Sequence, residues 1–277
     1  MATLRYLLKL SRPRFWLYLA GPVVVGVAFA ADTVTELFVP EALVLFAYFL
    51  LPANVLLYGV NDIFDADVDA ANPKKDEKEV RYQGDRTVVA AVVVSGLFGL
   101  ATFALTPPVA WPWLGGFFLL GVEYSAPPLR FKTTPFLDSL SNGLYILPGV
   151  AAYAAVAGAN PPPAAVVGGW LWTMGMHTFS AIPDIDPDRE AGIQTTATYL
   201  GERRTYWYCA LTWLLAALAF GTLDLRLGAL MLAYPVAVFG ITRSGVDVER
   251  AYWWYPVLNT AVGMLLTLGG LWEVVYG

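Results

Sequence analysis

Residues Leu43–Val60 read LVLFAYFLLPANVLLYGV, and the polar stretch NDIFDADVD follows directly at Asn61–Asp69. The first stretch is long enough and apolar enough to cross the hydrocarbon core of a bilayer as a helix. The second places four Asp and one Asn within nine residues at the end of that helix. Together they predict a membrane-spanning helix that carries an acidic cluster at one end.

The rest of the chain shares this apolar character. Of its 277 residues, 57% are hydrophobic and 14% are charged, whereas a water-soluble domain carries about a quarter charged residues. The apolar residues form long blocks, which is typical of an all-α polytopic membrane protein. A net charge of −5 is not typical of a nucleic-acid-binding protein, which carries an excess of basic residues. The single Cys excludes an internal disulfide.

Nine apolar segments predict nine transmembrane helices: 14–31, 42–60, 87–106, 109–124, 138–157, 164–182, 205–221, 226–242 and 253–275. The loops between them test this topology, because cytoplasmic loops are enriched in Lys and Arg. Sixteen of the seventeen Lys and Arg residues fall on one side, and only Arg226 falls on the other. We therefore expect a cytoplasmic N-terminus, an outside C-terminus and a location in the cell membrane.

The first segment has a second interpretation. Basic residues, an apolar run and Ala28-Phe29-Ala30 also resemble a signal peptide with its cleavage site. The apolar run is long for a signal peptide, so we interpret the segment as a retained span.

A second acidic cluster, PDIDPD at Pro183–Asp188, follows the sixth predicted span, on the same side as the first cluster. The repetition after four spans predicts a single transmembrane domain of two four-helix halves, 14–137 and 138–242, with 253–275 as a last helix. Each half would supply one acidic cluster to a shared site.

Helical spacing sorts the acidic residues into faces. Asn61, Asp62, Asp65 and Asp69 share one face if the second span continues as a helix, while Asp67 points elsewhere. Asp184 and Asp188 lie four residues apart and share another face. Crowded carboxylates repel each other unless a cation neutralises them, and hard oxygen ligands suit Mg²⁺ or Ca²⁺.

A calcium loop, a solvated helix end and an ion-coupled transporter fit the acidic clusters less well. A calcium loop beginning at Asp65 needs Gly and Glu where the chain has Ala70 and Asp76. A solvated helix C-terminus disfavours Asp, because a carboxylate there opposes the helix dipole. An ion-coupled transporter would place its carboxylates near the middle of the membrane, whereas these clusters lie at the ends of spans.

Basic residues accompany both clusters on the same side of the membrane. A combination of carboxylates and basic side chains indicates a metal-bridged anion, a diphosphate or a phosphate, whose tail lies among the helices. The basic residues concerned are Lys74, Lys75, Lys78, Arg81, Arg130, Lys132 and Arg189.

Three motifs resemble those of one family, the UbiA-type intramembrane prenyltransferases. Asn61–Asp69 matches its NDxxDxxxD motif, and EYSAPPLRFK at Glu123–Lys132 resembles its YSxPPxRxK stretch. DIDPDREAGIQTTATYLG at Asp184–Gly201 is similar to its second acidic motif. The resemblance covers the whole chain. One departure is Ser180, where members often carry a further Asp, and it leaves the number of metal ligands open.

The resemblance implies an enzyme with two Mg²⁺ ions that bridge the Asp clusters and an allylic diphosphate. Asp62 and Asp65 would be catalytic, and Tyr124 would face the allylic cation with its ring. The implied metal ligands are Asp62, Asp65, Asp69, Asp184 and Asp188. The implied diphosphate-binding residues are Asn61, Lys74, Lys75, Arg130, Lys132 and Arg189.

The stretch GMHTFSAIPDIDPD, Gly175–Asp188, is most like the carotenoid branch of the family, the lycopene elongases. That branch implies dimethylallyl diphosphate as donor and a carotenoid such as lycopene as acceptor. A quinone precursor or a glyceryl ether is the alternative acceptor. Attack on an alkene leaves a cation that loses a proton or takes up water. His177, the only His, and Glu123 are the candidate bases.

Overall fold

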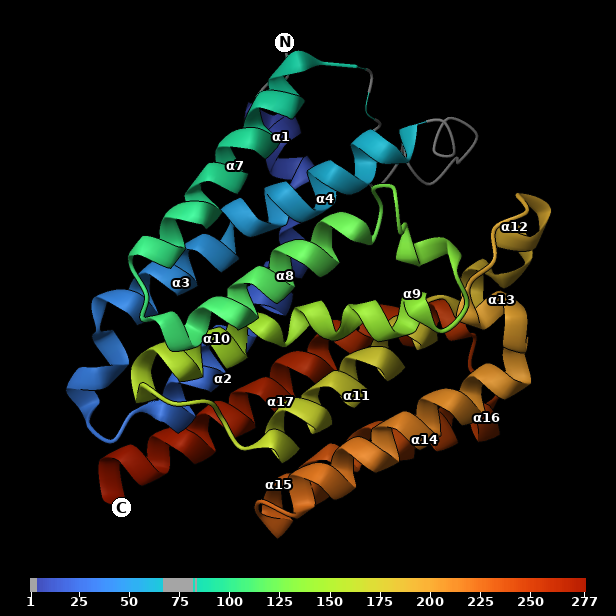
Figure 1. Ribbon diagram of the computed structural model, residues 1–277. Coiled ribbons are helices and arrows are strands. Elements are labelled where there is room, and N and C mark those ends of the chain that lie inside the picture. Colours follow the sequence, from blue (N-terminus) through green and yellow to red (C-terminus); the bar gives the residue numbers. More distant parts are fainter. Residues whose placement is uncertain (1–3, 67–81, 83) are drawn as a thin grey trace. The chain divides into compact units, whose positions relative to one another are not determined.

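The computed structural model describes residues 4–66, 82 and 84–277 (Figure 1). Helices dominate these residues, and no β-strand occurs among them, which agrees with the all-α prediction. Each of the nine ranges expected to span the membrane contains helix in this part of the chain. Asp67, Asp69, Lys74 and Lys75 lie outside the described residues.

The chain divides into two compact units, each built from separate stretches of sequence. Unit 1 comprises residues 1–129, 147–160 and 267–277, and unit 2 comprises residues 130–146 and 161–266. Residues 147–160 belong to unit 1 because α10 packs with the N-terminal stretch. The two four-helix halves stay a prediction.

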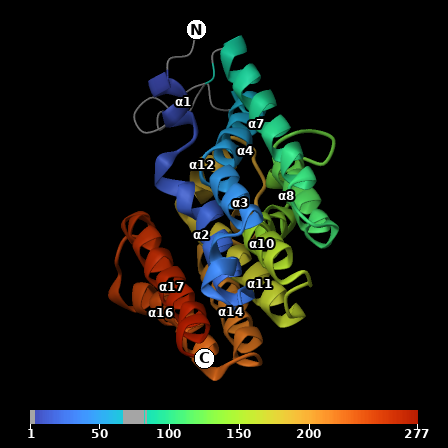
Figure 2. The same cartoon turned by 90° about the vertical axis from the view of Figure 1, so that its left-hand side faces the viewer.

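Unit 1 contains a set of long helices joined by short 3-10 turns. Its elements are α1 (Leu4–Leu10), η1 (Pro13–Phe15), α2 (Trp16–Ala30), η2 (Val34–Phe38), α3 (Pro40–Leu50), α4 (Pro52–Phe64), α7 (Arg86–Ala104), η3 (Pro108–Ala110), α8 (Trp111–Glu123), α10 (Leu147–Ala157) and the end of α17 (Val248–Tyr276). Helix α10 runs along α2 (Figure 1, Figure 2). A Cβ on Gly26 of α2 would lie 2.9 Å from the carbonyl carbon of Gly149 of α10, so these backbones approach too closely for a side chain.

A break at Leu51 divides the second predicted span into α3 and α4. Pro52 disfavours helical geometry at the preceding residue, and Leu51 has φ −128° and ψ −58°. The side chain of Asn54 donates to the carbonyls of Phe49 and Leu50, both at 3.0 Å, and so satisfies groups that the break exposes. Helix α4 therefore starts afresh at Pro52 and carries its polar end to Asn61–Asp65.

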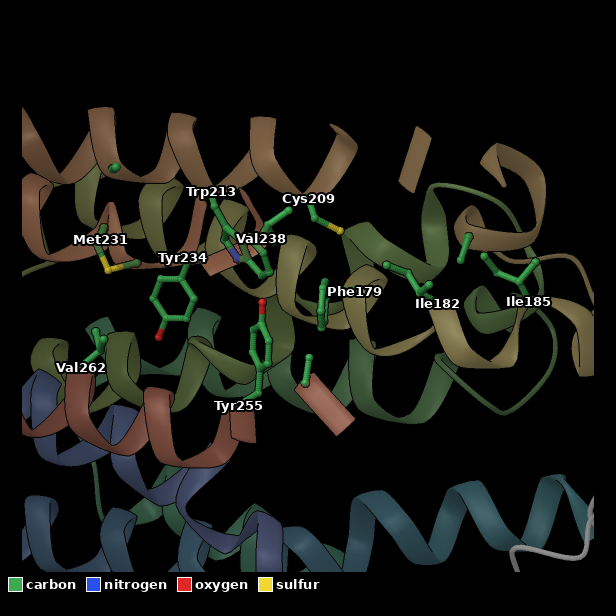
Figure 3. Close-up of a cluster of buried hydrophobic side chains, with 13 residues drawn as sticks. Phe179, Ile182, Ile185, Cys209, Trp213, Met231, Tyr234, Val238, Tyr255 and Val262 are labelled. Atoms are coloured by element: carbon green, nitrogen blue, oxygen red, sulfur yellow. The ribbon is translucent and has the colours of Figure 1, made fainter. Parts of the chain in front are cut away.

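Unit 2 surrounds an aromatic core (Figure 3). Its elements are η4 (Phe131–Thr133), α9 (Leu137–Leu140), η5 (Ser141–Tyr145), α11 (Pro163–Ser180), η6 (Ile182–Asp184), α12 (Ile185–Glu190), α13 (Thr196–Leu200), α14 (Glu202–Gly221), α15 (Leu225–Met231), α16 (Ala233–Ser244) and the first part of α17. The ring of Phe179 stacks on Tyr255 with centroids 4.6 Å apart. Tyr255 also stacks on Trp213 at 5.9 Å, so one aromatic column joins α11, α14 and α17.

Six helical stretches among the described residues have the length and composition to cross a membrane: Pro13–Ala30, Pro40–Phe64, Arg86–Ala104, Leu137–Ala157, Leu225–Ser244 and Val248–Tyr276. The other three expected spans contain α8, α11 and α14, which do not meet the same length and composition. Helix α8 is too short, and α11 and α14 carry more polar residues. The chain is thus a multi-pass membrane protein, while the count of nine spans and their orientation stay predictions.

Arg226, the exception in the loop charges, is paired locally. Its Nη2 atom lies 2.7 Å from Asp224 Oδ2, and its backbone N–H donates to Asp224 Oδ1 at 2.6 Å. Hydrogen bonds from the Arg226 side chain and backbone lower the pKa of the Asp224 carboxyl.

Candidate active site

The first acidic cluster forms at the last turn of α4. Asp62 and Asp65 are nearly closed to solvent, with 2% and 6% of their surface exposed, whereas Phe64 between them is exposed. Asn61 Nδ2 donates to Asp65 Oδ2 at 2.8 Å, one helical turn further on. These three polar side chains thus lie on one side of the helix, as their spacing predicts.

Asn61 also connects this cluster to the EYS stretch. Its Nδ2 atom donates to Ser125 Oγ at 3.0 Å, across 64 positions of sequence. Ser125 is buried and follows Tyr124 directly, so the half-buried ring of Tyr124 comes from the segment that holds the end of α4. Two motifs recognised separately in the sequence therefore meet in unit 1.

Arg12 is a member of this cluster that the sequence motifs do not reveal. Its Nη2 atom lies 3.4 Å from Asp62 Oδ1, and its guanidinium carbon lies 4.5 Å from the ring centroid of Tyr58. Arg12 has a left-handed backbone conformation, with φ 49°, at the turn between α1 and η1. The guanidinium compensates the buried carboxylate of Asp62.

The second acidic segment lies in unit 2. Asp184 ends η6 and Asp188 lies in α12, and prolines at the start of both elements interrupt the helix that α11 would otherwise continue. Asp184 and Asp188 are both half-buried, whereas Asp186 between them is exposed. The pattern agrees with a shared face for Asp184 and Asp188.

Arg189 holds the acidic segment to the next helix. Its Nη2 atom donates to the carbonyl of Thr198 in α13 at 3.1 Å, and its Nη1 atom lies 3.4 Å from Asp186 Oδ1. Arg130 and Lys132 lie at the start of unit 2, in and beside η4, and both are half-buried. Arg130 has a left-handed backbone conformation with φ 42°.

The two candidate bases have different surroundings. Glu123 Oε2 accepts a hydrogen bond from the backbone N–H of Leu129 at 3.2 Å, which ties it to its own loop. His177, on the last turn of α11, has Nε2 3.9 Å from Oδ2 of Asp138. Asp138, fully buried at the start of α9, is the second residue that the motifs do not reveal. A lone Asp within the apolar stretch FLDSL was a signal that could have found it.

The donor chemistry of the first cluster fits Mg²⁺. Among the residues that the structure describes, no three His, Cys, Asp or Glu side chains gather closely enough to enclose a metal by themselves. Mg²⁺ at phosphate-transferring sites is held by one or two carboxylates together with substrate phosphates. Asp62 and Asp65, adjacent on one turn of α4, supply such a partial ligand set.

The comparisons with known proteins agree with these observations. The chain is 72% identical over 272 residues to the lycopene elongase/hydratase of Haloferax volcanii, covering 98% of this chain and 90% of that protein. It is 66% identical to the Halobacterium salinarum protein of the same name, covering 99% of each. A solved UbiA homolog from Archaeoglobus fulgidus, bound to DMAPP and Mg²⁺, shares the fold with a TM-score of 0.79 at 20% identity, covering 98% of this chain and 100% of that one.

The family model of the UbiA prenyltransferase family matches residues 19–271. That range includes both acidic segments, the EYS stretch and the Asp138–His177 pair. The chain therefore belongs to the UbiA prenyltransferase family and is an enzyme that transfers prenyl groups.

Proposed function

We propose that this enzyme uses Mg²⁺ to transfer a dimethylallyl group from dimethylallyl diphosphate to the end of a forty-carbon carotene such as lycopene. Water then adds to the tertiary cation that the transfer leaves on the carotenoid. The observation that carries the proposal is the buried cluster of Asn61, Asp62 and Asp65, held against the Tyr124–Ser125 segment. The names of the relatives from Haloferax and Halobacterium support the carotenoid acceptor.

The residues divide into three roles. The proposed Mg²⁺ ligands are Asp62, Asp65, Asp69, Asp184 and Asp188. When bound, the metal supplies Lewis-acid polarisation of the diphosphate oxygens. The proposed diphosphate-binding residues are Asn61, Lys74, Lys75, Arg130, Lys132 and Arg189, which would stabilise the negative charge on the leaving diphosphate.

Bond making and breaking then follow from the substrates. The C–O bond of dimethylallyl diphosphate breaks, and the diphosphate leaves with the electron pair. The terminal alkene of the carotene donates its electrons to the allylic cation, forming a C–C bond and a tertiary cation. Tyr124 is proposed to stabilise the allylic cation through the face of its ring. The apolar helices keep water from the allylic cation until the acceptor reaches it.

The active-site loops are proposed to lie on the cytoplasmic side of the cell membrane. A charged donor would then enter from the water-filled compartment, while an apolar carotene would enter from the bilayer. Both acidic segments follow helices that lie in expected spans, α4 and α11, which supports an entry from each phase.

Co-expression tests the acceptor. The full chain would be produced in bacteria that make lycopene. The extracted carotenoids would be separated, and their molecular masses would be measured by mass spectrometry. The proposal expects products extended by one and by two five-carbon units. Unchanged lycopene would exclude it as the acceptor and redirect the search to a quinone precursor or a glyceryl ether.

Substitution tests the carboxylates. In membranes, Asp62→Ala and Asp184→Ala should abolish release of pyrophosphate, because each removes a proposed metal ligand. Glu190→Ala provides a matched control, since this carboxylate belongs to the same segment but is exposed. Turnover near the wild-type rate in either of the first two variants would overturn the assignment. An ion-coupled transporter would instead show cation flux in liposomes without pyrophosphate release.

A further inference from the structure

Asp138 is a buried carboxylate whose hydrogen bonds come from a distant segment. Both its backbone and its side chain are closed to solvent. The backbone N–H of Thr196 donates to Asp138 Oδ2 at 2.9 Å, and the hydroxyl of Thr196 donates to Oδ1. These two donors, at the start of α13, fix the plane of the carboxylate.

The imidazole of His177 faces the same carboxylate. Its Nε2 atom lies 3.9 Å from Asp138 Oδ2, and about a fifth of the His177 side chain is exposed, against 1% for Asp138. A buried carboxylate is costly unless a proton donor or a positive charge compensates it. At this distance, which is longer than a hydrogen bond, the negative charge of Asp138 favours a proton on Nε2 and leaves Nδ1 as the basic nitrogen of the ring.

The neighbour of Asp138 anchors α9 to two other helices of unit 2. Ser139 Oγ donates to the carbonyl of Met174 at 3.2 Å and accepts a hydrogen bond from Thr178 Oγ1 at 2.8 Å. It also lies 2.9 Å from the hydroxyl of Tyr208 in α14. Because α9 is fixed to α11 and α14, the carboxylate of Asp138 has little freedom to move away from the imidazole.

The pair stands at the base of the second acidic segment. His177 lies seven residues before Asp184, and Thr196 lies eight residues after Asp188. Both ends of the segment that carries Asp184 and Asp188 thus contact one carboxylate. A partly exposed imidazole backed by a fully buried carboxylate has the arrangement of a general base and its orienting acid.

We propose that His177 takes the proton released when water adds to the carotenoid cation, and that Asp138 is the positioning residue that orients His177. This step rests on the proposed function. The oxygen of water forms a bond to the tertiary carbon, one O–H bond breaks, and its proton passes to Nδ1 of His177. The carboxylate of Asp138 stabilises the resulting imidazolium. The pair thereby determines whether the extended carotenoid leaves as an alcohol or as an alkene.

The test is the ratio of hydroxylated to dehydrated extended carotenoids, measured in membranes of cells that make lycopene. His177→Gln and Asp138→Asn should each lower the hydroxylated fraction by at least about tenfold, a lower bound for the loss of a general base. Release of pyrophosphate should stay within about threefold of wild type, because transfer precedes hydration. Asn at 138 keeps an acceptor for Thr196 but loses the charge that orients the imidazole. The double variant should be no worse than either single variant, since the residues act as a unit.

Ser141→Ala is the matched control. Ser141 is buried and donates to the Asp138 carbonyl at 3.2 Å, so its removal disturbs the packing of α9 without touching the carboxylate. The control should leave the product ratio unchanged. An unchanged ratio in both His177→Gln and Asp138→Asn, or an equal fall in Ser141→Ala, would overturn the inference. If Asp138→Asn does not accumulate, His177→Gln decides the question by the same criterion.

Two wild-type outcomes separate this inference from the proposed function. Unchanged lycopene would mean that the proposed transfer itself is wrong. Extended carotenoids without any hydroxylated product would leave the transfer standing and overturn the role assigned to His177 and Asp138.

Discussion

Asn61 is expected to control the metal requirement through two hydrogen bonds of unequal strength. Ser125→Ala removes the neutral bond at 3.0 Å, whereas Asn61→Ala also removes the 2.8 Å bond to the carboxylate of Asp65. A neutral hydrogen bond contributes about 1 kcal/mol, and one to a charged group about 1.5–3 kcal/mol. Ser125→Ala should therefore raise the Mg²⁺ concentration for half-maximal activity about fivefold. Asn61→Ala, which removes both bonds and so about 2.5–4 kcal/mol, should raise it by about seventyfold to eight-hundredfold.

The assay is pyrophosphate release from membranes across a Mg²⁺ titration. For Ser125→Ala the maximal rate at saturating Mg²⁺ should approach that of wild type, because Asp65 itself remains. Ser95→Ala, a buried Ser in α7, is the control and should leave the titration unchanged. The double variant should match Asn61→Ala, since Ser125 is expected to act on Asp65 through Asn61. Multiplied effects in the double variant, or an equal loss in Ser125→Ala and Asn61→Ala, would refute the reasoning.

Three further expectations concern packing and charge. Gly26→Ala should lower the melting temperature in detergent, because its methyl group meets the Gly149 carbonyl. Gly21→Ala is the control and should leave the melting temperature unchanged, because a Cβ at Gly21 has no atom within 4 Å. A Gly26→Ala protein as stable as Gly21→Ala would contradict the close approach of the helices. Arg12→Gln should destabilise the metal-free protein, because it leaves the buried carboxylate of Asp62, 2% exposed, without its positive partner. Mg²⁺ should restore part of the lost stability by compensating the same carboxylate. A loss of stability that Mg²⁺ does not reduce would contradict the expectation that Arg12 and Mg²⁺ compensate the same charge. Chelation by EDTA should stop pyrophosphate release and Mg²⁺ should restore it, and activity that survives EDTA would exclude the metal.

The positions of helices followed well from the sequence, because long apolar blocks and prolines act locally. All nine expected ranges contain helix among the described residues, and the break before Pro52 obeys the restriction on residues that precede proline. The grouping of helices into compact units depends on contacts between distant parts of the chain. Gly149 packs against α2 through a contact between distant parts of the chain, and a repeat of acidic clusters says nothing about which helices touch.

In the candidate site, too, local contacts could be predicted from the sequence and contacts between distant residues could not. Asn61 and Asp65 are one helical turn apart, so their hydrogen bond follows from spacing alone. Arg12 and Asp62 are 50 positions apart, and Asp138 and Thr196 are 58 positions apart, so only the tertiary fold reveals these pairs. A buried charge in an apolar helix, such as Asp138, was nevertheless visible in the sequence as an exception that needs a partner.

The interleaving of unit 1 also affects biosynthesis. Helix α2 leaves the ribosome well before α10 and before the end of α17, where Gly270 approaches Ala28. During translation α2 therefore stays in the bilayer without these packing partners until they are made. Its apolar composition allows it to do so. A stop codon before Thr267 would remove part of the N-terminal unit as well as the tail, and cellular proteases would encounter an unfinished helix bundle.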